Sequence, residues 1–185
     1  MLKREYDQVC SVARSLEILG ERWTLLVIRD VFTGKRRFDA IQADLGIARN
    51  VLAARLARLV EEGILERRPY QRRPPRHEYL LTEKGLELWP VMVAMMDWGD
   101  RHLADAGPPV VIRHKGCRGR VDGRGHCERC GERLDARDAY AEPGPGTAEP
   151  AAAGPLAAAV GATGSDARST RAVGQLPSPS WIPGA

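Results

Sequence analysis

The sequence contains no apolar run long enough to cross a bilayer. Its longest apolar stretches, such as WTLLVI at residues 23–28, are far shorter than the roughly 20 residues that a membrane helix needs. The N-terminus MLKREYDQVC has no apolar core after its charges, so it does not resemble a signal peptide. We therefore expect no membrane partner and a cytoplasmic location. There the four cysteines are predicted to be thiols or metal ligands rather than structural disulfides.

Motifs of catalysis are also missing. No Ser-His-Asp spacing, phosphate-binding loop or dinucleotide-binding motif is visible, and an enzyme needs such groups to converge in a pocket. We therefore predict that the protein is not an enzyme. The length of 185 residues suits one domain plus an extension, and the net charge of +4 allows an anionic partner without proving one.

Residues 37–63 carry the pattern around which the chain is organised. In RFDAIQADLGI, apolar residues recur at helical spacing, and Gly46 follows where a left-handed residue would end a helix. Residues 46–63 predict a second helix with an apolar face and an opposite face of small or polar side chains. The apolar face holds Leu52, Leu56, Leu59 and Val60, and the opposite face holds Asn50, Ala53, Ala54, Ala57 and Arg58.

This second face suits contact with DNA. Small residues allow a close approach to another surface, and Asn and Arg are side chains that read or hold DNA. Two short helices joined by a glycine-containing turn are typical of a helix-turn-helix motif. An ordinary helical hairpin within a core is the alternative for this stretch alone.

A β-hairpin is predicted directly after the second helix. The segments ILERRPY, at residues 64–70, and HEYLLT, at residues 77–82, have strand character, and Pro74 and Pro75 between them favour a turn. A hairpin in this place makes a winged helix, and basic residues at its tip would contact phosphates. The alternative is a solvated basic face. The arginines of the hairpin are Arg67, Arg68, Arg72, Arg73 and Arg76.

Three further helices are expected around this motif. The first covers residues 10–19, and the second, from about residue 22 to 32, is predicted to be the buried centre. The last begins with Thr82 as its N-cap, fades near residue 102, and is kinked or split by Pro90. It carries more apolar side chains than one small domain can cover, which favours a homodimer over a helix folded back on its own domain. These side chains are Leu86, Leu88, Trp89, Val91, Met92, Met95, Met96 and Trp98.

The segment from residue 10 to 102 resembles the HxlR family of winged-helix transcriptional regulators, which is related to the MarR group. The resemblance rests on an early cysteine, GERWTLL, NVLAARLARLVEEGILERR and YLLTEKG. It implies a homodimer that binds a pseudo-palindromic operator in double-stranded DNA at the bacterial nucleoid, usually as a repressor and sometimes as an activator. By position, Arg49 and Asn50 would reach base edges and Ala53 would face the DNA. The residues expected to hold phosphates are Arg58, Arg72, Arg73 and Arg76.

Cys10 stands where many members of this family have a cysteine, which in some of them senses oxidants or electrophiles. Such chemistry needs a thiolate with a lowered pKa, which the N-terminus of a helix starting near Ser11 would favour. We therefore consider Cys10 a candidate redox sensor that would make DNA binding responsive to such signals. The alternative is a small packing residue.

A metal-ligand pattern follows Gly107. His114 and Cys117 form H-x2-C, and Cys127 and Cys130 form C-x2-C nine residues later. Each pair would bind the ion from one tight turn, which predicts a tetrahedral Zn²⁺ site with four protein ligands and therefore a structural role. The metal would stabilise a segment that is too small to fold by burial of apolar side chains alone. His126 competes as the fourth ligand, but the spacing of His114 mirrors the C-x2-C half.

Other interpretations of the same segment stay open at this point. Cys127 and Cys130 would also suit a redox dithiol, the segment without metal is another alternative, and an exchangeable zinc would itself be a signal. The segment resembles the small zinc-ribbon-like extension of some actinobacterial-type relatives of the family.

The predicted fold class is α+β: a winged helix-turn-helix, mainly α with a β-hairpin, plus a small zinc-ribbon-like segment and a tail. We expect a DNA-binding and dimerisation domain at residues 1–106, a zinc-binding segment at 107–141, and a disordered Ala/Pro/Gly-rich tail at 142–185. The alternative function is a zinc-dependent protein-interaction module that uses the winged helix as a platform for a partner.

Overall fold

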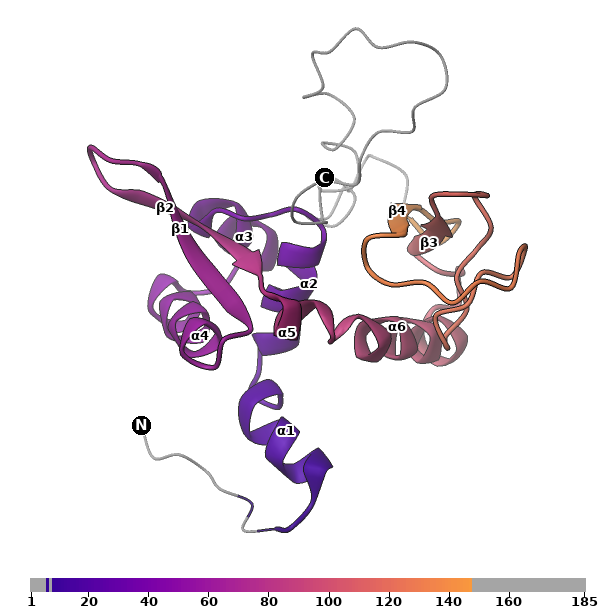
Figure 1. Cartoon of the computed structure of the whole chain (residues 1–185), viewed down its shortest axis with the longest axis horizontal. Coiled ribbons are helices and arrows are strands. Elements are labelled where there is room, and N and C mark those ends of the chain that lie inside the picture. The colour runs from indigo at the N-terminus through magenta and orange to yellow at the C-terminus, as the bar shows by residue number, and fades with distance from the viewer. Residues whose placement is uncertain (1–5, 7, 148–185) are drawn as a thin grey trace, which may run out of the picture. The chain divides into compact units, whose positions relative to one another are not determined.

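The computed structural model in Figure 1 describes residues 6 and 8–147. Within this range the chain forms two compact units, residues 6, 8–31 and 36–85 in the first, and residues 32–35 and 86–147 in the second. The predicted tail lies outside the described residues from position 148 onward. None of the helices in the described range is both long and apolar enough to span a membrane.

The first unit contains the predicted helices and hairpin in the predicted order. Its elements are α1 (Ser11–Leu19), α2 (Thr24–Phe32, of which Phe32 belongs to the second unit), α3 (Phe38–Leu45), α4 (Arg49–Glu61), β1 (Leu65–Gln71), β2 (Arg76–Leu81) and α5 (Glu83–Leu86, which ends in the second unit). These elements form the helix-turn-helix (α3 and α4) and the following hairpin that the sequence predicts. The β1–β2 hairpin is called the wing below.

Helix α2 is buried, as its apolar pattern predicts. Val27 and Ile28 are fully buried and Val31 nearly so. The helix begins at Thr24, two residues later than expected, because Trp23 adopts a left-handed backbone conformation with φ of 79°. The Arg22 guanidinium lies 4.8 Å from the centre of the Trp23 ring in this turn.

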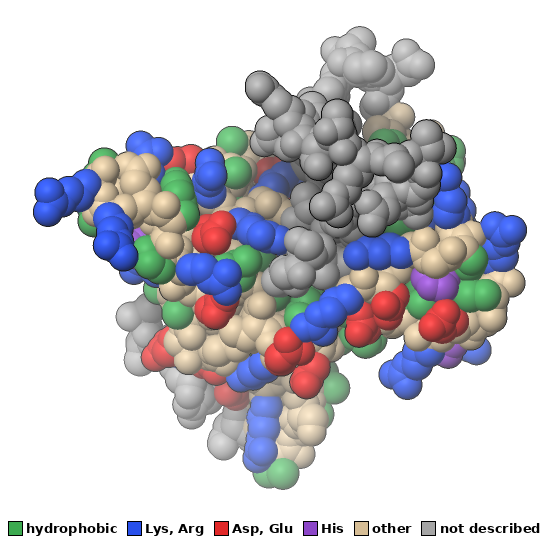
Figure 2. All heavy atoms as spheres, turned by 45° about the horizontal axis from the view of Figure 1, so that its top comes forward, with side chains coloured by type: hydrophobic (Ala, Val, Ile, Leu, Met, Phe, Trp, Pro, Cys, Tyr) green, Lys and Arg blue, Asp and Glu red, His purple; other side chains and the backbone are tan. Residues whose placement is uncertain are grey.

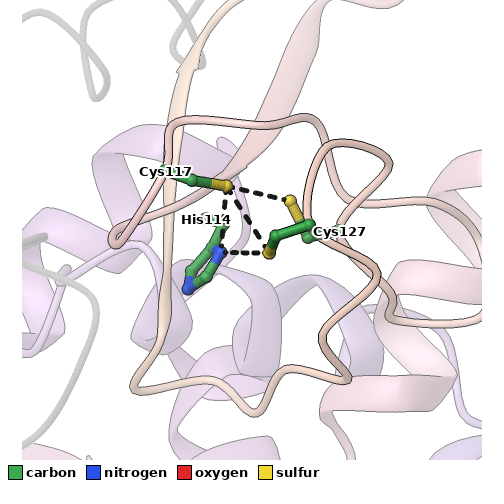
Figure 3. Close-up of side chains that lie close together, drawn as sticks. His114, Cys117 and Cys127 are labelled. Atoms are coloured by element: carbon green, nitrogen blue, oxygen red, sulfur yellow. Dashed lines mark hydrogen bonds between the residues drawn. The ribbon is translucent and has the colours of Figure 1, made fainter.

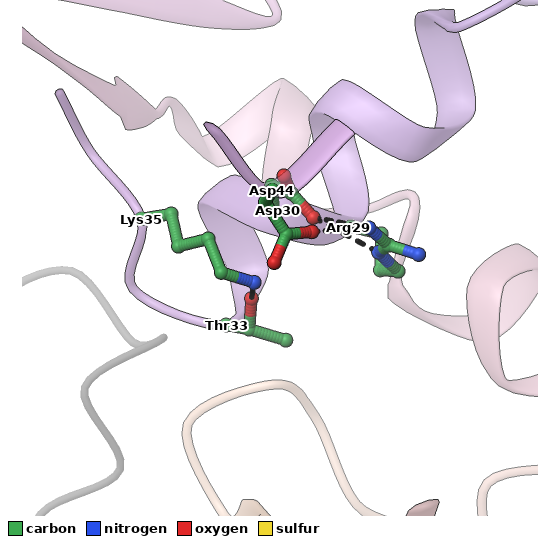
Figure 4. Close-up of polar contacts among 5 residues, drawn as sticks. All are labelled: Arg29, Asp30, Thr33, Lys35 and Asp44. Carbon is green, nitrogen blue, oxygen red and sulfur yellow. Dashed lines mark hydrogen bonds and ion pairs between the residues drawn. The ribbon is translucent and has the colours of Figure 1, made fainter. Parts of the chain in front are cut away.

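A buried ion pair ties α2 to α3, as Figure 4 shows. Arg29 Nη2 lies 2.6 Å from Asp30 Oδ1 and 2.9 Å from Asp44 Oδ2. The Asp30 side chain is completely buried. Since an isolated buried carboxylate is costly, this bridge compensates the burial of Asp30 and fixes the spacing of the two helices.

The turn between α3 and α4 has the geometry that the sequence predicts. Gly46 ends α3 with φ of 60°, a left-handed conformation that costs glycine least. Ile47 then inserts into the core with 4% exposure. The Gln42 amide donates a hydrogen bond to the Ile47 carbonyl over 3.3 Å, which holds the turn.

The wing is an antiparallel hairpin that extends beyond the helices of its unit (Figure 1). Leu65 pairs with Leu81 at its base, and Gln71 pairs with Arg76 at its tip. Tyr79 N–H also donates to the Arg36 carbonyl over 2.7 Å, and Arg37 forms a bridge with Glu78. The chain just before α3 therefore forms a short third edge of the wing.

The second unit contains α6 (Trp89–Leu103), β3 (Val110–His114) and β4 (Ala139–Pro143). Pro90 splits the predicted last helix rather than kinking it, because proline is tolerated in the first turn of α6. Trp89 is buried, and its ring centre lies 6.2 Å from that of Phe32. Thr82 caps the short α5, since its Oγ1 accepts a hydrogen bond from Gly85 N–H over 3.1 Å.

Strands β3 and β4 are absent from the sequence-based prediction. They pair antiparallel, with Val110 opposite Pro143 and His114 opposite Ala139. Residues 142 and 143, which we assigned to the tail, therefore belong to this sheet, and Arg113 Nε binds Glu142 Oε1 over 2.6 Å. The expected boundary at residue 106 likewise falls inside the second unit, which joins α6 to the C-terminal segment.

The packing of α5 against β1 yields a prediction about Gly85. A Cβ atom at this buried glycine would collide with the Ile64 carbonyl oxygen and approach the Leu81 side chain to 2.9 Å. We expect Gly85→Ala to lower the free energy of unfolding by about 1–3 kcal/mol. Gly99→Ala is the matched control, because a Cβ there meets no atom within 4 Å and should be neutral or stabilising by up to about 1 kcal/mol. Chemical denaturation followed by tryptophan fluorescence measures both, and equal stabilities would contradict the close packing.

Candidate DNA interface and metal centre

Helix α4 presents the two faces that its sequence predicts. Leu52, Leu56 and Leu59 are buried to 1% exposure or less, whereas Asn50 and Ala53 are exposed. Burial of each leucine contributes roughly 1.5–3 kcal/mol, so this face determines how α4 is rotated about its axis. Ala54 and Ala57 are also exposed, and the outer face is therefore flat and short-chained.

Arg49, the first residue of α4, is exposed but held in place by α3. Its Nη1 donates to Asp39 Oδ1 over 3.1 Å and to Gln42 Oε1 over 3.0 Å. Its guanidinium carbon lies 4.7 Å from the centre of the Phe38 ring. Sequence reasoning missed these three partners, although Phe38, Asp39 and Gln42 lie at helical spacing that places them on neighbouring parts of α3.

Arg58 is engaged with its own helix. Its guanidinium binds Glu61 over 3.0 Å and Glu62 over 2.5 Å. These two carboxylates neutralise the charge that was expected to hold a phosphate. Of the predicted phosphate contacts, Arg58 is therefore less favourably placed than the arginines of the wing.

The wing carries Arg72, Arg73 and Arg76 at its tip, and all three are exposed. Figure 2 shows Lys and Arg side chains gathered at the end of the β1–β2 hairpin. Gln71 Nε2 donates to the Arg73 carbonyl over 3.0 Å, which orders the tip. Next to the tip, the Arg37 guanidinium lies 4.6 Å from the centre of the Tyr70 ring, so the residue that precedes α3 contacts the wing.

The four predicted metal ligands converge in the second unit. The donor atoms of His114, Cys117, Cys127 and Cys130 all lie within 4.8 Å of one another. His114 Nδ1 is 3.3 Å from Cys117 Sγ and 3.3 Å from Cys130 Sγ, and Cys117 Sγ is 3.3 Å from Cys127 Sγ (Figure 3). A tetrahedron of ligands about 2.3 Å from a zinc ion has edges of roughly 3.7 Å, so the cluster fits such an ion with small adjustments.

The two halves of the cluster repeat the same turn. Arg118 N–H donates to the His114 carbonyl over 2.8 Å, and Gly131 N–H donates to the Cys127 carbonyl over 2.8 Å. Arg118 and Gly131 have the same left-handed conformation, with φ of 63° and 74°. The H-x2-C and C-x2-C pairs, which have the same spacing in the sequence, therefore also have the same backbone turn.

His114 rather than His126 belongs to the cluster. His126 is outside it, and its Nδ1 lies 4.0 Å from the Asp122 carboxylate. The second ring nitrogen of His114, Nε2, lies 3.6 Å from Glu132 Oε2. A carboxylate in this position orients a metal-binding histidine so that Nδ1 faces the ion. Sequence reasoning missed Glu132, although it follows the last cysteine by two residues.

The backbone around the cysteines favours thiolates at one position. Burial raises the pKa of Cys127, but the N–H groups of Cys130 and Arg129 outweigh it and lower this pKa to about 6. At Cys130 the Glu132 N–H lowers the pKa, but burial and the neighbouring Cys127 and Cys117 outweigh it and raise the pKa. Ligation by metal requires deprotonated cysteines, and the backbone N–H groups favour this form at Cys127.

Close packing surrounds the cluster. A Cβ atom at Gly119 would collide with Cys127 Sγ, so only glycine fits there. Among the described residues, the segment buries a small apolar core as well, which the sequence analysis underestimated. Its members are Val111, Ile112, Val121, Leu134, Ala136 and Ala139.

Cys10 lies apart from this cluster in the sequence and is the N-cap residue of α1. It is exposed, and its carbonyl accepts the Arg14 N–H over 3.0 Å. Exposure disfavours the alternative of a packing residue. None of the four cysteines is part of a disulfide in the structure.

Comparison with known proteins agrees with this geometry. The family model of the HxlR-like helix-turn-helix matches residues 18–106. The uncharacterized HTH-type transcriptional regulator Rv3095 of Mycobacterium tuberculosis is 49% identical over 137 residues, which cover 74% of this chain and 87% of the relative. An alignment of that length passes residue 130 wherever it begins, so it includes the segment of the four clustered ligands.

Two further comparisons point to the same family. The uncharacterized HTH-type transcriptional regulator YdeP of Bacillus subtilis is 34% identical over 94 residues, covering 50% of this chain and 73% of that protein. The crystal structure of PA1607, a candidate transcription factor, has a TM-score of 0.58 and 36% identity, and the match covers 71% of this chain and 93% of that one. The chain therefore belongs to the HxlR-like helix-turn-helix family, whose members are DNA-binding transcriptional regulators and not enzymes.

Proposed function

We propose that the protein is a homodimeric repressor that binds a pseudo-palindromic operator. The observation that carries this proposal is the outer face of α4, where Asn50 and Ala53 are exposed beside a wing with three exposed arginines. A flat helical face with a polar N-terminus fits the major groove, and the wing tip supplies phosphate contacts. Base-edge contacts would come from Arg49 and Asn50, and phosphate contacts from Arg72, Arg73 and Arg76, with Arg58 as a weaker contributor.

The apolar stripe of α6 supports the homodimer. Val91, Met95 and Trp98 follow one another at helical spacing, and each is 44–54% exposed. The His102 ring lies against Trp98, with 5.1 Å between the ring centres and a tilt of 45°, and extends the stripe by one turn. A row of large apolar side chains at this spacing is suited to pairing with a second copy of the same helix, and a two-fold dimer would present two α4 helices to the operator.

The clustered His114, Cys117, Cys127 and Cys130 support a structural Zn²⁺ site. One imidazole and three thiolates in a tetrahedron are the ligands that zinc prefers, and four protein ligands leave no position open for catalysis. Exposure of Cys10 at the start of α1 supports a redox or electrophile response of DNA binding, which we propose as the signal.

The DNA-binding roles predict different effects for α4 and the wing. Arg72→Ala with Arg73→Ala should weaken binding to operator and random DNA alike and reduce the salt slope by about 2, because two phosphate contacts are lost. Asn50→Ala should instead lower only the preference for the operator, by roughly 5- to 150-fold.

Gel shifts at several salt concentrations measure both effects, with DNA selected from a random pool as the operator. Arg124→Ala, an exposed arginine of the C-terminal segment, is the control for loss of positive charge. An unchanged salt slope in the wing variant would contradict the phosphate role, and equal losses on both DNAs with Asn50→Ala would contradict base reading.

The metal site predicts a contrast between the two histidines. Wild-type protein should hold about one zinc per chain, His114→Ala should lose most of it at equilibrium with a chelator, and His126→Ala should keep it. Elemental analysis after dialysis against the chelator gives the stoichiometry. Retention of zinc by His114→Ala, or its loss from His126→Ala alone, would reverse the ligand assignment.

The proposed dimer predicts sensitivity at Met95. Met95→Glu should raise the Kd of the dimer roughly 100-fold or more, because it buries a carboxylate without a partner. Met95→Leu, which keeps an apolar side chain of similar size, should leave the dimer intact. Analytical ultracentrifugation separates the outcomes, and a Met95→Glu dimer as stable as wild type would exclude the stripe as the interface.

A further inference from the structure

The guanidinium of Arg49 is oriented by α3 through one of its nitrogens. Both of its hydrogen bonds to described residues use Nη1, one to Asp39 Oδ1 and one to Gln42 Oε1. Nη1 carries two hydrogens, and these two acceptors take both. The ring of Phe38 lies 4.7 Å from the guanidinium carbon and restricts its plane.

This arrangement directs the opposite edge of the guanidinium outward. Nε and Nη2 carry two N–H groups that are nearly parallel, as bidentate contacts require. In the major groove of DNA, guanine offers two neighbouring acceptors, O6 and N7, whereas adenine pairs one acceptor with a donor and thymine offers a single acceptor. A guanidinium whose Nε–Nη2 edge alone faces the DNA can therefore donate to both acceptors of guanine and is expected to prefer this base.

The contacts with α3 contribute little to the folded state. The Arg49 and Asp39 side chains are 68% and 79% exposed, and ion pairs at such exposure add little stability. A carboxylate at this surface also repels phosphates, which disfavours binding to DNA in general. These contacts can instead favour specific binding by orienting Arg49, because a long side chain already fixed loses less conformational freedom on binding.

We propose that Asp39 and Gln42 orient Arg49 so that its Nε–Nη2 edge binds O6 and N7 of one guanine in each operator half-site. Asp39 and Gln42 act as positioning residues, and Arg49 alone touches the base. The inference rests on the proposed function, since it requires α4 to enter the major groove.

The test is selection of DNA from a random pool by the full-length protein and its variants, followed by Kd measurements on single-base changes. Arg49→Lys keeps the charge but cannot make the bidentate contact. We expect wild type to select one invariant guanine in each half-site, and Arg49→Lys to lose roughly 5- to 150-fold of the preference for it. Arg124→Lys, at an exposed arginine outside α4 and the wing, should keep the full preference.

Asp39→Ala separates positioning from simple electrostatics. It removes a negative charge, so affinity for random DNA should rise, whereas the preference for the guanine should fall toward that of Arg49→Lys. Asp105→Ala removes an exposed carboxylate elsewhere and should raise affinity, if at all, without a change in base preference. Circular dichroism melting curves confirm that each variant is folded before its DNA binding is compared.

The outcomes distinguish this inference from the proposed function. An enriched motif whose preference survives Arg49→Lys would overturn the guanine contact while operator binding stands. Equal changes in operator and random-DNA affinity with Asp39→Ala would overturn the positioning role. Failure of the wild type to enrich any motif would overturn sequence-specific binding itself, and the guanine contact with it.

Discussion

Burial of the leucine stripe of α4 is the constraint on which the winged-helix unit depends. Leu52, Leu56 and Leu59 are nearly inaccessible to solvent, and no other rotation of α4 would bury all three. The face that remains outside is therefore fixed by the core rather than by the ligand. A single side chain there changes what the helix contacts without changing where the helix lies, which is how one fold serves regulators with different operators.

The stability of the second unit depends on a different interaction, because its C-terminal segment is small. Its C-terminal segment has a small apolar core and also brings the donor atoms of His114, Cys117, Cys127 and Cys130 within 4.8 Å of one another. A segment of this size gains little from apolar burial alone, and a metal ion would supply the missing free energy through two identical turns. The match of backbone hydrogen bonds and of left-handed residues in both turns shows that the geometry is encoded in the chain itself.

Much of this could be predicted from the sequence because the signals are local. Apolar spacing located α2 to α4, Gly46 located the turn, and the H-x2-C and C-x2-C pairs located the cluster. Strands β3 and β4 were missed, since their partners are 25 or more residues apart and AYAEP carries no clear strand pattern. The partners of Arg49 and the carboxylate of Glu132 were missed for a related reason: they depend on side-chain directions that residue spacing does not define.

Helix α6 carries both the exposed stripe proposed for the dimer and contacts with the C-terminal segment that holds the four clustered ligands. One side of this helix carries the exposed stripe of Val91, Met95 and Trp98, while Asp97 lies so close to Gly123 that a Cβ atom there would collide with its carboxylate. Asp100 has a raised pKa because of its burial, which the positive charge of Arg120 partly offsets. The C-terminal segment thus packs on the helix whose opposite residues would form the dimer.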